Sequence, residues 1–251
     1  MARLTQDSAL GSSREDVQRF VELFHVTDPG IPMVRLGPGG DGSYLVPDDL
    51  EGIVACFSPG VSSSADVELA LAERGIRSHL ADGSVAAPPT AHELFDFEPV
   101  FVGVSTRPGW TTLGDWVSTK EPEGDLILQM DIEGAEWTVL AQTDAALLGR
   151  FRVVVLELHA LHTLHQRFTL PAIEDVWRKV LDQFVVVHLH VNNYEFPIDY
   201  LGVEIPPAME VTLLRKDRVV STSQARLPHP LDTPNSSHLP DFGVPPAWYR
   251  P

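Results

Sequence analysis

The stretch D-L-I-L-Q-M-D-I-E-G-A-E-W, residues 125–137, decides the fold. A largely apolar run of strand length ends abruptly on Asp131, Glu133 and Glu136. A strand buried on both faces has such a run, and strands of this kind belong to parallel sheets covered by helices. Open α/β sheets bind their ligands outside the carboxyl ends of the strands, where these carboxylates lie. The stretch therefore predicts a central strand and a site at its end.

Outward from this stretch, strand-like and helix-like segments alternate. Strands are expected at 53–58, 77–82, 99–104, 125–130, 153–158, 184–191 and 209–215. Helices are expected at 14–25, 65–75, 136–142 and 171–182. This alternation predicts an α/β fold with a Rossmann-like, mostly parallel central sheet and helices on both faces. Because the loop between the last two strands is short and Pro-rich, we expect one of them to be an antiparallel edge strand.

Composition divides the chain into three expected parts. Residues 1–32 form an N-terminal helical segment, and 33–217 form the α/β domain, which begins with two short strands around a glycine-rich turn. Residues 218–251 are rich in Pro, Ser, His and Asn, and they read as an extended arm without a core of its own.

Charge and cysteine usage narrow the expected partners. The 251 residues carry a net charge of −17, which repels nucleic acid and anionic lipid. No apolar segment has the length of a membrane span, and residues 1–28 show no signal-peptide pattern. The single cysteine, Cys56, cannot form an internal disulfide, which is typical of a reducing, cytoplasmic setting. We therefore expect a soluble partner, with no nucleic acid and no membrane insertion.

A turn of small residues and an acidic residue indicate an adenosine-containing cofactor. The strand at 53–58 leads into P-G-V-S-S-S, where Gly60 lets a ligand approach the backbone. Asp82 follows the next strand, where a carboxylate can accept both ribose hydroxyls of a nucleoside. The fingerprint G-x-G-x-x-G is absent, which argues against a dinucleotide. A plain strand-to-helix turn with a capping aspartate is the alternative.

Acidic and imidazole side chains end three further strands. Asp131 and Glu133 follow one strand, Glu157 and His159 end the next, and His190 lies in the strand after it. If these strands are neighbours, Asp131, Glu157 and His190 converge and could hold Mg²⁺ or Mn²⁺. Taken singly, each has an ordinary explanation as a helix cap, a strand end or a core histidine.

With these residues placed, the sequence resembles the FkbM-type S-adenosylmethionine-dependent O-methyltransferases. The motifs that carry the resemblance are G-D-G-S-Y-L-V-P-D-D-L (40–50), C-F-S-P-G-V-S-S-S-A-D-V-E (56–68), Asp82, L-x-M-D-I-E-G-A-E-W (128–137), L-E-L-H (156–159), H-x-H-x-N-N-Y (188–194) and L-D-T-P-N (231–235). They span most of residues 33–240. The glycine turn departs from the E/D-x-G-x-G form of the family, because Pro59 and three serines replace glycines.

The resemblance implies a methyltransferase domain over residues 33–217 and a set of site residues. The residues expected to bind the cofactor are Gly42, Tyr44, Ser58, Gly60, Ser62, Asp82 and Asp131. The expected ligands of a divalent cation, Mg²⁺ by ligand hardness, are Asp131, Glu157 and His190. Glu133 is the expected general base, and His159 and His190 are the alternatives.

The expected reaction is direct methyl transfer to a sugar hydroxyl. A hydroxyl has a pKa far above neutrality, so it needs a base or a cation to stabilise the forming alkoxide. In length and composition the chain is also similar to mycobacterial enzymes of methylmannose polysaccharide synthesis, including one that 1-O-methylates 3-O-methylated mannosides. We expect a sugar or oligosaccharide acceptor and a homodimer. A nucleotide-binding oxidoreductase and a non-catalytic binding protein are the alternatives.

Overall fold

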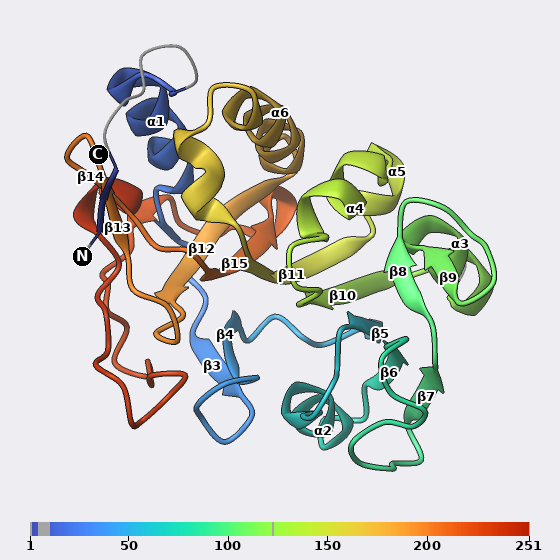
Figure 1. The fold of residues 1–251 in the computed structure, drawn as a ribbon. Coiled ribbons are helices and arrows are strands. Elements are labelled where there is room, and N and C mark those ends of the chain that lie inside the picture. Colours follow the sequence, from blue (N-terminus) through green and yellow to red (C-terminus); the bar gives the residue numbers. More distant parts are fainter. Residues whose placement is uncertain (1, 5–10, 122, 251) are drawn as a thin grey trace.

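The computed structural model of the chain describes residues 2–4, 11–121 and 123–250. Its centre is a seven-stranded sheet in the order β12-β15-β11-β10-β5-β6-β7 (Figure 1). The strands of this sheet are β5 (Ile53–Pro59), β6 (Arg77–Ala81), β7 (Phe95–Glu98), β10 (Asp125–Met130), β11 (Phe151–Leu158), β12 (Phe184–Val191) and β15 (Met209–Arg215). Neighbours from β7 to β11 are parallel, whereas β15 is antiparallel to β11 and β12. The predicted Rossmann-like, mostly parallel sheet is confirmed.

The antiparallel strand was predicted at an edge of the sheet, and that position is wrong. β15 lies between β11 and β12, so β12 forms the edge. The segment between β12 and β15 contains a hairpin of β13 (Ile198–Tyr200) and β14 (Val203–Ile205) and no α-helix. A connection of this kind returns the chain antiparallel to the strand it left. β15 therefore pairs with β12 on one side and inserts against β11 on the other.

The strand predicted at 99–104 is also misplaced. The main sheet ends on β7, and residues 101–103 form β8 (Phe101–Gly103) in a separate parallel pair with β9 (Trp110–Thr112). Pro99 lies between β7 and β8, and it has no N–H to give to a sheet ladder. The edge strand F-D-F-E is half-buried and lacks a continuous apolar run, so its sequence does not resemble that of the buried strands.

Helices cover both faces of the sheet, as predicted (Figure 1). The helices on one face are α1 (Arg14–Val21), α3 (Leu113–Lys120), α4 (Glu136–Gln142), α5 (Ala145–Leu148) and α6 (Thr169–Leu181). The opposite face is covered by α2 (Asp66–Ala72) and by the hairpin of β3 (Met33–Leu36) and β4 (Tyr44–Pro47). Each face therefore has its own hydrophobic core. None of the described helices is long and apolar enough to cross a membrane.

The C-terminal arm packs on the same chain. Trp248 is fully buried, with its ring 5.0 Å from that of Phe24, which in turn stacks on Trp177 at 4.4 Å. Nearer the start of the arm, Asp232 Oδ1 lies 2.9 Å from His188 Nε2. The arm therefore shares the core of the domain and crosses the end of the sheet.

The remaining elements are short. They are β1 (Ala2–Leu4), β2 (Thr27–Asp28), β16 (Ser223–Gln224) and the 3-10 turns η1 (Glu22–Phe24), η2 (Leu161–His165), η3 (Lys216–Arg218) and η4 (Pro246–Trp248). β1 pairs with β13 and β16 pairs with β2, so the N-terminal strand and the first part of the C-terminal arm are tied to neighbouring segments. Residues 1 and 5–10 of the predicted N-terminal segment lie outside the described residues.

Candidate active site

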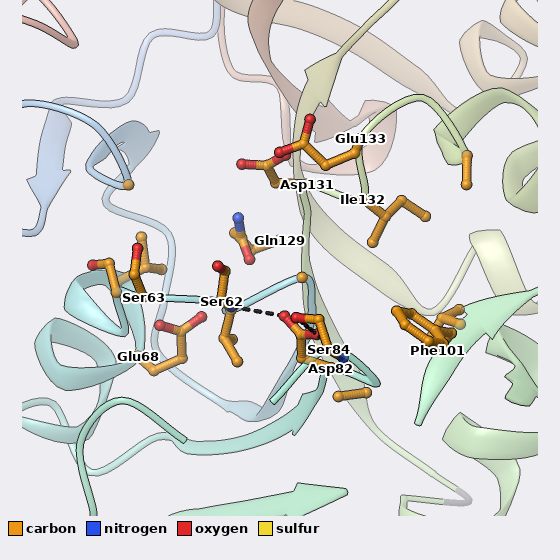
Figure 2. Close-up of a pocket in the computed structure, with 18 of the residues that line it drawn as sticks. Ser62, Ser63, Glu68, Asp82, Ser84, Phe101, Gln129, Asp131, Ile132 and Glu133 are labelled. Carbon is orange, nitrogen blue, oxygen red and sulfur yellow. Dashed lines mark hydrogen bonds between the residues drawn. The ribbon is translucent and has the colours of Figure 1, made fainter. Parts of the chain in front are cut away.

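A pocket of about 500 Å³ opens at the carboxyl ends of β5, β6 and β10. Its walls come from the turn and helix after β5, the loop after β6, and the start of the loop after β10. Asp41, Gly42 and Tyr44 of the β3–β4 hairpin close another side. The pocket lies where a parallel α/β sheet is expected to bind a ligand. Figure 2 draws 18 of its lining residues and labels ten of them.

Gly60 lets the turn after β5 approach β10 very closely. Its φ is +96°, and a Cβ atom on this residue would lie 1.6 Å from the backbone oxygen of Asp131. The backbone N–H of Gly60 donates to Ala81 O at 2.9 Å, and that of Asp131 donates to Pro59 O at 3.3 Å. No side chain fits this position, so glycine is required here for packing and for conformation.

Asp82 joins two loops of the pocket. Its Oδ2 accepts the backbone N–H of Ser62 at 2.8 Å (Figure 2), and its Oδ1 accepts the N–H of Ser84 at 2.7 Å. An ionised carboxylate offers about four acceptor positions, so these bonds leave Oδ2 able to accept a further hydroxyl. Asp82 can therefore hold the turn after β5 in place and still bind a ligand.

The pocket has chemically different ends. On one side of Asp82 lie Phe101 and Ile132, and on the other lie Ser63 and Glu68 (Figure 2). The Phe101 ring packs on Trp110 with a centroid separation of 4.9 Å. One end of the pocket is therefore aromatic and apolar, and the other is polar and acidic.

Four carboxylates surround one imidazole at the rim. His159 Nε2 lies 3.9 Å from Asp131 Oδ1, 3.6 Å from Glu133 Oε2 and 3.6 Å from Glu157 Oε1. On its other side, His159 Nδ1 lies 3.2 Å from Glu136 Oε1. One ligand atom from each of Asp131, Glu133 and His159 lies within 4.8 Å of the others. This acidic cluster borders the pocket through Asp131 and Glu133.

Glu136 organises the turn that presents the cluster. Its buried carboxylate accepts the backbone N–H of Ile132 at 2.9 Å and that of Gly134 at 3.1 Å. Between them, Glu133 has a φ of +56°, in the left-handed region that non-glycine residues rarely adopt. The same carboxylate holds His159, so Glu136 fixes the turn and the imidazole together.

Burial and repulsion between neighbouring carboxylates raise pKa values in the acidic cluster, so its groups retain protons. Burial raises the pKa of Asp131 to about 7, and burial with the charges of Asp131 and Glu210 raises the pKa of Glu157 to about 9. Burial alone would lower the pKa of His159, but the hydrogen bond and charge of Glu136, with the other carboxylates, raise it to about 9. A cation bound here would displace such protons, because ligand groups bind metals in their deprotonated forms.

A family model described as the methyltransferase FkbM domain matches residues 70–196. The chain belongs to the FkbM methyltransferase family. A search of curated proteins finds no match. The matched region runs from within α2 to the loop after β12, so it includes Asp82, Asp131 and the rest of the acidic cluster.

The FkbM domain match does not extend to the glycine-rich elements of the pocket. The predicted cofactor residues before residue 70 are Gly42, Tyr44, Ser58, Gly60 and Ser62. All of them except Ser58 line the pocket, together with Asp82, Asp131 and Glu133. Burial and the nearby carboxylates raise the pKa of Tyr44, which keeps its hydroxyl protonated.

Ser58 lies behind the pocket of this FkbM methyltransferase. It is fully buried, and its hydroxyl contacts Glu68 and Gln129, two residues that do line the pocket. Sequence reasoning missed Glu68 and Gln129. A signal for Gln129 exists, because it is the one polar residue within the apolar run L-I-L-Q-M.

His190 is not brought to the predicted cation ligands. The prediction assumed that β11 and β12 are neighbours, and this is wrong because β15 separates them. In the register of the sheet, Glu210 of β15 faces Glu157 on one side and His190 on the other. His190 Nδ1 lies 3.4 Å from Glu210 Oε2. The ligand atoms that the structure gathers are those of Asp131, Glu133 and His159, with Glu157 adjacent.

Proposed function

We propose that this FkbM methyltransferase uses S-adenosylmethionine to methylate a sugar hydroxyl, with a divalent cation at the acidic cluster. The observation that carries the proposal is that one pocket borders two separate acidic groups, a single aspartate and the acidic cluster. Asp82 lies along its wall, and Asp131 and Glu133 bring the acidic cluster to its rim (Figure 2). Asp82 suits a ribose, and the acidic cluster suits a cation and an acceptor hydroxyl.

The pocket suits the parts of S-adenosylmethionine. The free acceptor position of Asp82 can take a ribose hydroxyl, and the apolar surface beside Phe101 and Ile132 can pack on an adenine ring. The acidic lining favours a sulfonium, which is a cation. A methyl group directed toward Asp131 and Glu133 would then meet an acceptor bound at the cluster.

The cluster also suits a divalent cation. Among the described residues, Asp131 Oδ1 is buried without a hydrogen-bond partner, and a bound cation would satisfy such an atom. Carboxylate oxygens of Asp131 and Glu133, with His159 Nε2 beside them, are a donor set for Mg²⁺ or Mn²⁺. A cation held there would lower the pKa of an acceptor hydroxyl.

The protein side chains would orient the acceptor and take its proton. Glu136 fixes His159 through Nδ1, so Nε2 faces the rim. The Glu133 side chain is 88% exposed and can reach a bound hydroxyl. We assign the general base to Glu133, with His159 as the alternative. Loss of a general base typically costs about 10²- to 10⁴-fold in rate, so Glu133→Gln should lower kcat by that order.

Ligand binding and turnover test this function. Calorimetry should detect binding of S-adenosylmethionine and S-adenosylhomocysteine, and Asp82→Asn should weaken both. Labelled methyl groups should then be transferred to one or more sugars in a panel that begins with mannosides. Binding of NAD alone would favour an oxidoreductase, and cofactor binding without turnover on any acceptor would favour a non-catalytic protein. We also propose a homodimer, which light scattering would measure.

A further inference from the structure

Glu68 is a buried acid in the pocket wall that the proposed reaction does not use. It lies in the first turn of α2, is only 3% exposed and lines the polar end of the pocket. Burial raises the pKa of its carboxyl. Within the described residues, no lysine, arginine or histidine forms an ion pair with it, so it has no cationic partner of its own.

The contacts of Glu68 favour its protonated form. Ser58 Oγ is hydrogen-bonded to Glu68 Oε1 and lies 2.6 Å from Gln129 Oε1. A hydroxyl has one proton to donate, so Ser58 cannot satisfy two bare acceptors. A protonated Glu68 resolves this, because it donates to Ser58, which then donates to Gln129. That extra proton satisfies the chain of three side chains, and burial, which raises the pKa of Glu68, favours it.

Glu68 places a carboxyl at the end of β5, a strand that has no acidic side chain of its own. Residues 53–60, which form β5 and its turn, contain no acidic side chain. Glu68 reaches the end of β5 from α2 instead, and it lies across Asp82 from Phe101 (Figure 2). If ribose lies at Asp82 and adenine beside Phe101, the amino-acid end of the cofactor extends toward Glu68.

We propose that Glu68 binds the α-ammonium group of S-adenosylmethionine and thereby positions the amino-acid end of the cofactor. This inference rests on the proposed function. The charge balance is simple: the proton of Glu68 passes to solvent when the cofactor binds, and the resulting carboxylate accepts hydrogen bonds from the ammonium group. A buried carboxylate is stable when it is paired in this way.

Calorimetry with two ligands and two variants tests the proposal. The ligands are S-adenosylhomocysteine and its analogue without the α-amino group, and the variants are Glu68→Gln and Glu73→Gln. Glu73 is the exposed C-terminal cap of α2, so Glu73→Gln makes the same substitution in the same helix outside the pocket. Glu68→Gln should weaken S-adenosylhomocysteine roughly 10- to 100-fold, the usual size for a hydrogen bond to a charged group. It should leave the deamino analogue unchanged, and Glu73→Gln should leave both unchanged.

Equal weakening of both ligands, or of neither, by Glu68→Gln would overturn the inference. If the wild-type protein binds neither ligand, the proposed function itself fails. Should Glu68→Gln not fold, the wild-type protein still provides a test by calorimetry in two buffers of different ionisation enthalpy. S-adenosylhomocysteine should release more protons than its deamino analogue, and equal release would reject the role of Glu68.

Discussion

Asn235 in the C-terminal arm donates its side-chain amide to Glu210 Oε1 at 2.6 Å, and the same amide lies 3.2 Å from Asp41 Oδ1. The backbone N–H of Asp41 also donates to Asn235 O at 3.2 Å. Asp41 belongs to the pocket wall, whereas Glu210 lies beside Glu157 in the sheet. One arm residue therefore connects the pocket wall to the sheet end that carries the acidic cluster.

Replacement of Asn235 by alanine should therefore affect both stability and binding. Removal of one partner of a buried hydrogen bond leaves Glu210 Oε1 unsatisfied, which costs about 1–3 kcal/mol in the free energy of unfolding. Because Asp41 in the pocket wall also loses its hydrogen bond from the Asn235 side chain, affinity for S-adenosylhomocysteine should fall several-fold. Urea denaturation and calorimetry measure the two effects, with the exposed Ser237→Ala as the matched control. Unchanged affinity in Asn235→Ala would show that the arm does not brace the pocket.

Gly60→Ala should be far more damaging than a substitution at another glycine that also has a positive φ. Both Gly60 and Gly75 have positive φ, where a side chain costs about 1–2 kcal/mol. At Gly75 a Cβ atom meets nothing within 4 Å, whereas at Gly60 it would overlap the backbone of Asp131. We expect Gly75→Ala to fold with a loss of that size, and Gly60→Ala to lose more than twice as much, as measured by denaturation. Similar losses would mean that the turn moves easily away from β10.

Removal of the cation should abolish methyl transfer. Chelation should stop turnover and added Mg²⁺ should restore it, because the acceptor hydroxyl then loses the group that lowers its pKa. Asp131→Asn should weaken Mg²⁺ binding by at least about 10-fold, whereas the exposed Glu93→Gln should not change it. Calorimetry with Mg²⁺ measures the affinity and labelled cofactor measures turnover. Full activity in chelator would remove the cation from the mechanism.

The raised pKa of Glu157 predicts an unusual pH dependence of stability. Its folded pKa of about 9 exceeds its ordinary value of 4.5, so the folded state binds this proton more tightly than the unfolded state. Its contribution is therefore greatest below about pH 4.5 and is lost as the pH rises toward 9. In chelator, Glu157→Gln should gain stability relative to wild type across that range. A constant difference between the two proteins in denaturation from pH 5 to 9 would contradict the shift.

The site residues that could be predicted are those whose position depends on local sequence. Asp82 and Asp131 directly follow buried strands, and Glu157 and His159 end one, so the parallel sheet places all four at one end. Ser58 was assigned to the pocket through the family resemblance, and the structure places its side chain behind the pocket wall. A strand buried on both faces has no polar alternation, so the sequence does not indicate which side chains point toward the ligand.

Features that depend on distant pairing could not be predicted. The partners of β12 are set by residues 209–215, and no pattern in β11 or β12 indicates that a later strand separates them. His190 was placed with the cation ligands for this reason. Glu68 was missed because an acid in the first turn of a helix ordinarily faces the helix dipole at the surface. Only the three-dimensional packing shows that its carboxyl is buried beside Ser58.

The insertion of β15 between β11 and β12 also sets an order of events during synthesis. β12 joins the sheet only through β15, which the ribosome makes later. Until residue 215 has emerged, the edges of β11 and β12 that β15 covers are unpaired, and exposed edges promote pairing with other chains. A chain cut before residue 209 should therefore aggregate rather than give a smaller stable domain, whereas parallel pairs from β7 to β11 can form during translation.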